Sequence, residues 1–167
     1  EHAYQEAVAM EKIRWGIIGT GNISHTFAQG LRGLDDAVLV AVASRTREKA
    51  EAFAAEMGAK RAYGTYEELA RDEAVDVIYI GVPHTEHYEC AMLCIQNGKN
   101  VLCEKPFTLN AEFSQNLVAA AQKHNTFLME AMWTKCLPVI QKVKEWVDQG
   151  TIGELKNINA SFGFYAR

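Results

Sequence analysis

Two glycines near the start of the sequence have the spacing of a phosphate-binding turn. Gly19 and Gly21 stand in GIIGTGNIS, after an apolar run and before a segment of helical periodicity. Gly19 would allow a tight strand-to-helix turn, and Gly21, without a Cβ, would let a pyrophosphate approach backbone N–H groups at the positive helix end. Ser24 replaces the third glycine of the usual pattern, and an ordinary glycine turn is the alternative interpretation. The residues expected to contact a dinucleotide are Gly19, Thr20, Gly21, Asn22 and Ile23.

The residues after the second apolar run indicate which dinucleotide would fit. An enzyme that uses NAD(H) usually has a carboxylate here, which accepts hydrogen bonds from ribose hydroxyls. This chain instead has Ser44, Arg45, Thr46 and Arg47. Hydroxyl and guanidinium groups complement a 2'-phosphate, so we expect Ser44, Arg45 and Arg47 to bind NADP(H), with NAD(H) as the less favoured cofactor. Alternatively, Ser44 or Thr46 caps the next helix and both arginines are solvated.

A third polar segment, GVPHTEH, follows the apolar run 77–80. Open α/β sheets bind their ligands beyond the carboxyl ends of the strands, so we expect Pro83, His84 and His87 to line the cofactor site or to cap a helix. The three-residue spacing could place both imidazoles on one helix face. No carboxylate or cysteine at suitable spacing completes a metal site there, and none is predicted.

A charged pair, Glu104 and Lys105, follows the short apolar run 101–103 in the segment VLCEKP. A lysine in this position could hydrogen-bond or protonate a substrate oxygen, with Glu104 setting its charge and orientation. Hydride transfer at a carbinol must be matched by such a proton transfer. Glu104 and Lys105 are therefore the candidate catalytic residues, although a Glu-Lys pair by itself is usually a solvated loop feature.

These four segments are placed by a repeated alternation of strand and helix. Apolar runs rich in Val and Ile are each followed by a longer segment of helical periodicity, which predicts the α/β class with a doubly wound parallel Rossmann sheet. The expected strands cover residues 13–18, 38–43, 61–63, 77–80, 101–103 and 127–130. The expected helices cover residues 23–31, 47–57, 66–71, 86–97, 111–124 and 139–149. Asn110 is a good N-cap, and Gly58, Gly98 and Gly150 follow helices at positions that favour glycine.

The two ends of the chain depart from this alternation. Residues 1–9 precede a methionine and are expected to be a tag or upstream segment, so the dinucleotide-binding domain is assigned to 10–135. Residues 136–167 are expected to form a connecting helix and the start of a truncated C-terminal substrate and dimerisation domain. The final stretch ELKNINASFGFYAR predicts one strand over 155–164, the first strand of that α+β domain.

Composition narrows the classes of partner. The 17 basic and 21 acidic residues give a net charge of -4 without a basic stripe, which argues against nucleic acid. No apolar run approaches the roughly 20 residues that span a bilayer, and the start has no signal-peptide pattern, so we expect a cytoplasmic protein without membrane contact. Four cysteines lack zinc-site spacing and are interpreted as buried free thiols. They are Cys90, Cys94, Cys103 and Cys136.

Taken in order, the segments GIIGTGNIS, SRT, GVPHTEH, NGKNVLCEKP and EAMWTK resemble the N-terminal domain of the glucose-fructose oxidoreductase and inositol dehydrogenase (Gfo/Idh/MocA) family. The resemblance covers residues 12–164, and the CEKP element is more specific than the glycine turn. The segment MEAMWTK is most similar to the branch that contains dimeric dihydrodiol dehydrogenase and NADP-dependent xylose dehydrogenase. That branch also agrees with Ser44 and Arg45, the residues that favour NADP(H).

The resemblance implies an enzyme that transfers hydride between NADP(H) and a CH–OH group of a sugar, polyol or dihydrodiol. It implies that Lys105 is the catalytic lysine, that Glu104 and His87 line the nicotinamide side, and that Trp133 borders the site. A plain core position is the alternative for Trp133.

The resemblance further places other catalytic groups and the dimer surface beyond Arg167. We therefore expect the chain to bind cofactor but to turn over poorly, and the full-length protein to be a homo-oligomer. A non-catalytic dinucleotide-sensing module is the competing interpretation. A methyltransferase is disfavoured because it explains neither Arg45 nor Lys105.

Overall fold

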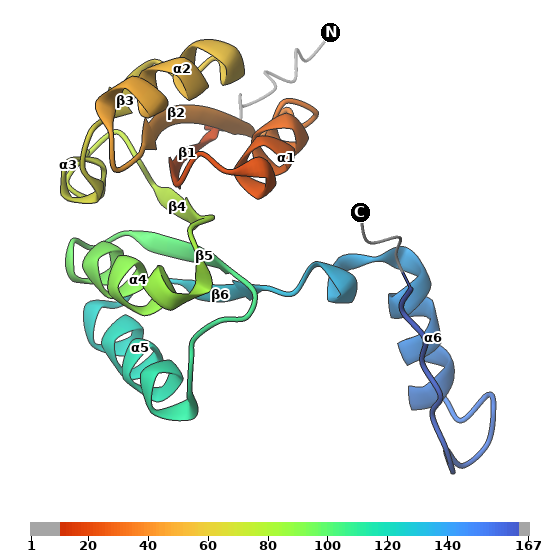
Figure 1. Cartoon of the computed structure of the whole chain (residues 1–167). Coiled ribbons are helices and arrows are strands. Elements are labelled where there is room, and N and C mark those ends of the chain that lie inside the picture. The colour runs from red at the N-terminus through yellow and green to blue at the C-terminus, as the bar shows by residue number, and fades with distance from the viewer. Residues whose placement is uncertain (1–10, 164–167) are drawn as a thin grey trace, which may run out of the picture. The chain divides into compact units, whose positions relative to one another are not determined.

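Within residues 11–163, which the computed structural model describes, six parallel strands form one sheet (Figure 1). The strands are β1 (Ile13–Ile18), β2 (Ala37–Ala43), β3 (Arg61–Tyr63), β4 (Val77–Ile80), β5 (Asn100–Glu104) and β6 (Leu128–Ala131). They lie in the order β3-β2-β1-β4-β5-β6, so the chain starts in the middle and moves outward, first to one edge and then to the other. The doubly wound Rossmann sheet that the sequence predicts is confirmed.

Helices cover both faces of this sheet, which buries the apolar strands on two sides. They are α1 (Asn22–Leu31), α2 (Arg47–Met57), α3 (Tyr66–Ala70), α4 (His87–Gln96) and α5 (Ala111–His124), with a 3-10 turn η1 (His84–Glu86) before α4. Phe53 of α2 packs with Ile17 on one face. Cys94 of α4 and Leu117 of α5 pack with Ile78 on the other.

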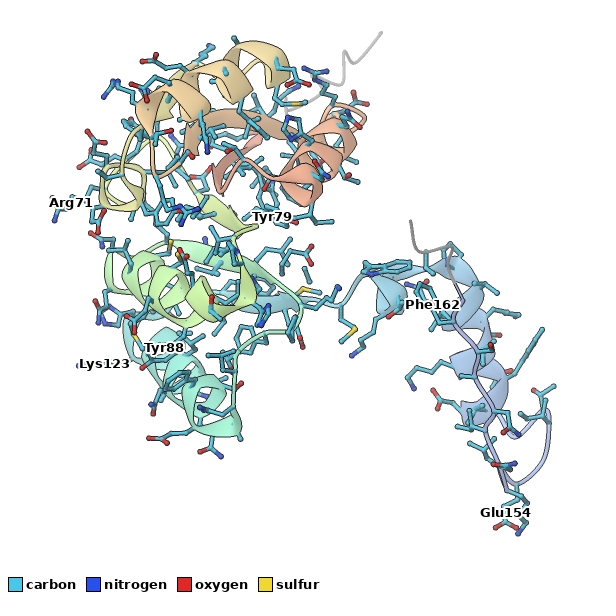
Figure 2. The ribbon with its side chains drawn as sticks, viewed as in Figure 1. Arg71, Tyr79, Tyr88, Lys123, Glu154 and Phe162 are labelled. Carbon is cyan, nitrogen blue, oxygen red and sulfur yellow. The ribbon has the colours of Figure 1, made fainter. Side chains whose placement is uncertain are left out.

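The residues that begin and end the helices act as the sequence predicts, and the helices also pack against one another. The Asn110 side chain accepts a hydrogen bond from the Phe113 N–H (2.8 Å) at the start of α5, as an N-cap should. Gly58 ends α2 in the left-handed region, at a φ of 80°. Between α4 and α5, the rings of Tyr88 and Phe113 stack with their centroids 4.3 Å apart, and Figure 2 labels Tyr88 there.

The amino ends of three strands are tied together by charged side chains. Arg14 of β1 donates from Nε to the Asp76 carboxylate (2.9 Å), which precedes β4. This hydrogen bond lowers the pKa of Asp76. Before β5, the Lys99 ammonium donates to the carbonyls of Asp72 (2.6 Å) and Val75 (2.9 Å), and burial lowers the pKa of Lys99. Arg14, Asp76 and Lys99 therefore all have hydrogen-bond partners within the protein.

The chain divides into two units, Glu1–Ala131 and Met132–Arg167. The described part of the second unit contains a 3-10 turn η2 (Trp133–Cys136) and a helix α6 (Pro138–Asp148), neither of which buries a residue. The strand predicted over 155–164 is wrong for residues 155–163, which form no strand, and residue 164 lies outside the described range. A strand exists only when another strand pairs with its backbone, and the described part of this unit offers none.

The thiols follow the same division. Cys90, Cys94 and Cys103 are buried in the first unit, and burial raises the pKa of Cys90 and Cys103 to about 12. Cys136 is exposed, which corrects the expectation that all four thiols are buried. It lies on η2, where no core surrounds it. Across residues 11–163, no helix combines the length and apolar character that crossing a bilayer requires.

Candidate functional site

The two glycines of the turn between β1 and α1 serve different purposes. Gly19 has a φ of 98°, and a Cβ built on it would lie 2.6 Å from the Gly81 carbonyl oxygen, so the fold itself requires glycine here. Gly21 is the N-cap of α1 with a φ of -82°, and a Cβ there would meet nothing within 4 Å. The space beside Gly21 is therefore open to a ligand, next to helix N–H groups that have no partner within the helix.

Ser24, which replaces the third glycine, lies at a close approach between α1 and β4. Its side chain is fully buried, and its Oγ has no hydrogen-bond partner among the described residues. A Cβ at Gly81, directly after β4, would clash with this Oγ. Ser24 thus fits because Gly81 is small. The sequence analysis did not single out Gly81, although a glycine directly after a buried strand was the available signal.

A groove of about 660 Å³ lies at the carboxyl ends of β1, β2 and β4. The predicted site residues that line it are Gly19, Thr20, Gly21, Ser44, Arg45 and Pro83. The Thr20 and Ser44 hydroxyls lie 3.5 Å apart, which joins the glycine turn to the end of β2. The Arg45 side chain is 73% exposed, and its Nη1 lies 3.8 Å from Glu86 Oε1. The groove thus combines an open helix N-terminus with an available cation.

The first turns of α2 place one predicted residue outside the groove and an unpredicted one inside it. Arg47 Nε donates to Glu51 one turn later (3.2 Å), and Arg47 does not line the groove. Lys49 does line it, together with Thr46. Ala50 and Phe53 are buried against the sheet, which fixes the rotation of the helix and hence the side chains that face the groove. The signal for Lys49 was its position four residues after Arg45.

Two further cofactor candidates, Asn22 and Ile23, begin α1. Their side chains do not line the groove, and Ile23 is half exposed. As the first two residues of the helix, they contribute the free backbone N–H groups that the prediction requires. His25, which was not predicted, lines the groove and approaches the Gly21 carbonyl through Nδ1 (3.0 Å) and Glu56 through Nε2 (3.2 Å).

The two histidines after β4 lie in different surroundings. His84 is exposed in η1 and does not line the groove. His87 is 1% exposed, with Nδ1 2.9 Å from the Pro106 carbonyl oxygen and Nε2 3.0 Å from the Val82 carbonyl oxygen. Neither ring nitrogen is left for a ligand. His87 joins the segment after β4 to the segment after β5, and its predicted contact with the nicotinamide stays a prediction.

The candidate catalytic pair lies at the end of β5, and its geometry differs from the expected one. Glu104 does not bind the Lys105 ammonium; its carboxylate accepts from the Tyr79 hydroxyl (2.8 Å) and from the Lys105 backbone N–H (3.1 Å). Lys105 is exposed, and its side chain has no hydrogen bond or ion pair within residues 11–163. Lys105 is therefore available to a ligand, with its backbone held by Glu104.

Tyr79 is a functional candidate that the sequence analysis missed. It is buried in β4 (labelled in Figure 2), stacks on Phe27 of α1 at 3.9 Å between centroids, and donates to Glu104. Burial, followed by the hydrogen bond to Glu104, raises its pKa far above the usual value. A lone hydroxyl in the apolar strand segment VIYI was the signal, since a buried tyrosine O–H needs a partner.

Trp133, the last predicted site residue, belongs to η2 of the second unit and is half exposed. Its place beside the nicotinamide stays a prediction. Within residues 11–163, no group of three or more His, Cys, Asp or Glu side chains could hold a metal ion.

The fold and the groove define a dinucleotide-binding domain, because an open helix N-terminus at the switch point of a doubly wound sheet binds a pyrophosphate. Residues 13–132 match the GFO_IDH_MocA family model, described as an oxidoreductase family with an NAD-binding Rossmann fold. The chain belongs to this Gfo/Idh/MocA oxidoreductase family, and the resemblance inferred from the sequence is confirmed.

Two curated relatives of this chain have the same name. The chain is 47% identical to trans-1,2-dihydrobenzene-1,2-diol dehydrogenase of Xenopus laevis over 152 residues, which cover 90% of this chain and 46% of that protein. It is 43% identical to the Homo sapiens protein of the same name over 153 residues, with the same coverage. The chain thus spans about half the length of these relatives, and the dihydrodiol dehydrogenase branch is confirmed.

Solved structures share the fold. An NAD-binding oxidoreductase from Klebsiella pneumoniae superposes with a TM-score of 0.81 at 33% identity, over 86% of this chain and 40% of that one. A 3-ketoreductase from Actinomadura kijaniata, solved with NADP, gives a TM-score of 0.79 at 30% identity, over 86% of this chain and 46% of that one.

Proposed function

We propose that this chain is the cofactor-binding half of an NADP(H)-dependent oxidoreductase that acts on a CH–OH group. The observation that carries the proposal is that two open features follow strands of the same sheet at their carboxyl ends. One is the groove at Gly21, and the other is the unpaired Lys105. The named dehydrogenase relatives support the same reaction class.

The residues around the groove fit a phosphorylated dinucleotide. The pyrophosphate would lie beside Gly21, where no Cβ intrudes and where the first N–H groups of α1 are free. Arg45, which follows β2, and Lys49, in the first turn of α2, supply two cations, and Ser44 supplies a hydroxyl, so a 2'-phosphate would be bound there. The solved 3-ketoreductase complex with NADP supports this choice over NAD(H).

In the reaction that we propose, NADP(H) would supply the hydride chemistry when bound to this domain. Lys105 would hydrogen-bond the substrate oxygen and take up or release its proton as the C–O bond changes order. Glu104 would hold the backbone of Lys105 rather than its ammonium group, because its carboxylate accepts from the Lys105 N–H and makes no ion pair with the ammonium within residues 11–163. Exclusion of water and recognition of the substrate would come from residues outside this domain.

The names of the relatives point to a dihydrodiol as the first substrate to test, with sugars and polyols as the other members of the class. Assembly into a homo-oligomer through a C-terminal sheet and a cytoplasmic location stay predictions.

The proposal is tested by Lys105→Ala in the complete reading frame that encodes this chain, with Lys123→Ala, at an exposed position of α5 (Figure 2), as the control. We expect Lys105→Ala to lower kcat for a trans-dihydrodiol or xylose by about a hundredfold or more, with the Kd for NADPH unchanged. Parent activity in Lys105→Ala, or absence of NADPH oxidoreductase activity in the parent, would contradict the proposal and favour a non-catalytic dinucleotide sensor.

A further inference from the structure

The turn that carries Lys105 is fixed by side chains from several elements. Glu104 accepts from the Lys105 N–H (3.1 Å), and His87 of α4 contacts the Pro106 carbonyl oxygen through Nδ1 (2.9 Å). Glu130 of β6 accepts from the Phe107 N–H through Oε1 (2.9 Å). Three consecutive residues after β5 thus each have a backbone atom bound by a side chain, although none of them lies in a strand or helix.

Glu130 is suited to hold this turn because the sheet fixes its position. It pairs with Cys103 across β5 and β6, and the next pair joins Glu104 to Ala131. The Phe107 amide lies beyond the end of β5, where no neighbouring strand can accept its hydrogen bond. A carboxylate that accepts from a backbone N–H makes a shorter and stronger bond than a neutral acceptor.

The Glu130 carboxylate has no competing cation. Within residues 11–163 it forms no ion pair, and its one hydrogen bond is the bond from the Phe107 N–H. Glu130 is partly buried, so its carboxylate loses part of its hydration. The hydrogen bond from the Phe107 N–H compensates for this loss, and Phe107 lies two residues after Lys105.

We propose that Glu130 is a positioning residue for Lys105: it anchors the backbone after the lysine to β6, while His87 anchors the intervening Pro106 to α4. The inference rests on the proposed function of Lys105. Without the Glu130 anchor, the turn would adopt more conformations and the Lys105 ammonium would sample a larger volume. The fraction of time in reacting geometry would fall, which lowers kcat more than it weakens cofactor binding.

The anchor itself is measured in the 167-residue chain without cofactor, by amide hydrogen exchange at Phe107. Glu130→Ala removes the acceptor and should speed this exchange by about tenfold. Glu130→Gln keeps a neutral oxygen acceptor and should restore most of the protection. Glu112→Ala, an exposed glutamate in the first turn of α5, is the control. If Glu130→Ala does not fold by circular dichroism, Glu130→Leu removes the acceptor while keeping most of the volume.

The consequence is measured in the complete protein. Glu130→Ala should lower kcat about tenfold with an unchanged Kd for NADPH, and Glu130→Gln should recover most of the rate. Unchanged Phe107 exchange in Glu130→Ala would overturn the anchor. Faster exchange with parent kcat, in a protein that Lys105→Ala inactivates, would overturn the positioning role while leaving the proposed function intact. Parent activity in Lys105→Ala would overturn both.

Discussion

The two edges of the sheet use charged residues in opposite ways. At the amino edge, Arg14 is bound to Asp76, and Lys99 donates to the carbonyls of Asp72 and Val75. At the carboxyl edge, Lys105 has no side-chain partner within residues 11–163, and Arg45 has only a distant contact with Glu86. The same sheet therefore has paired charged side chains where its strands begin and available cations where its strands end. Open α/β sheets bind their ligands beyond the carboxyl ends of the strands, which is where these two cations lie.

The glycine turn contains one glycine that the fold requires, Gly19, and one that leaves space for a ligand, Gly21. Two alanine variants separate these roles. Gly19→Ala places a Cβ against the Gly81 carbonyl in a left-handed conformation and should lower the free energy of unfolding by about 3 kcal/mol or more. Gly21→Ala meets nothing in the protein and should leave that free energy unchanged while weakening NADPH binding. Urea unfolding and NADPH titration of both variants measure the difference. Equal stability losses would refute the assignment.

The amino edge is tested by Lys99→Met. The variant leaves the carbonyls of Asp72 and Val75 without their donor and should cost about 2 kcal/mol of unfolding free energy. NADPH affinity should not change, because Lys99 lies at the opposite edge from the groove. Chemical unfolding and a cofactor titration of the same sample provide both values. A large loss of NADPH affinity in a folded variant would break the proposed separation of the two edges.

The cation at the groove is tested by Arg45→Ala, with Arg47→Ala as the matched control. Arg45 lines the groove and Arg47 does not, so Arg45→Ala should weaken NADPH about tenfold, or about 1.4 kcal/mol, and leave NADH affinity nearly unchanged. Arg47→Ala should change neither affinity. Fluorescence titrations of the two variants with NADPH and with NADH give the four dissociation constants. Equal effects of the two substitutions would indicate nonspecific attraction rather than a 2'-phosphate site.

The smallest effect is expected in the pH dependence of stability. The hydrogen bond from Arg14 lowers the folded-state pKa of Asp76, so its contribution is present above the unfolded pKa of about 3.9 and is lost as pH falls below it. Asp76→Asn should flatten the stability profile below about pH 4. The change should be at most about 1 kcal/mol, because the pair is partly exposed. Thermal unfolding between pH 3 and 6 measures it, and an unchanged profile would contradict it.

Sequence periodicity predicts this sheet well because inner strands such as β2 and β4 are buried on both faces, which produces apolar runs of the right length. The glycine turn was equally predictable, since Gly19 and Gly21 act through their own backbones. Contacts between residues far apart in the sequence were not predictable in this way. Glu130 meets Phe107 only because of the register between β5 and β6, which no local pattern encodes.

Helix rotation and strand pairing account for the remaining differences. The choice between Arg47 and Lys49 depends on how α2 packs, which is decided by tertiary contacts rather than by the order of cations in the sequence. The strand predicted over 155–164 had suitable residue types but no pairing partner in the described part of its unit. Propensity alone does not make a strand.

A fluorescence titration of the 167-residue chain with NADPH and NADH tests whether the carboxyl edge of this sheet binds NADP(H). We predict saturable binding of NADPH that is tighter than that of NADH, weakened by Gly21→Ala and unaffected by Lys99→Met. Absence of saturable binding, or NADH binding as tight as NADPH binding, would contradict it.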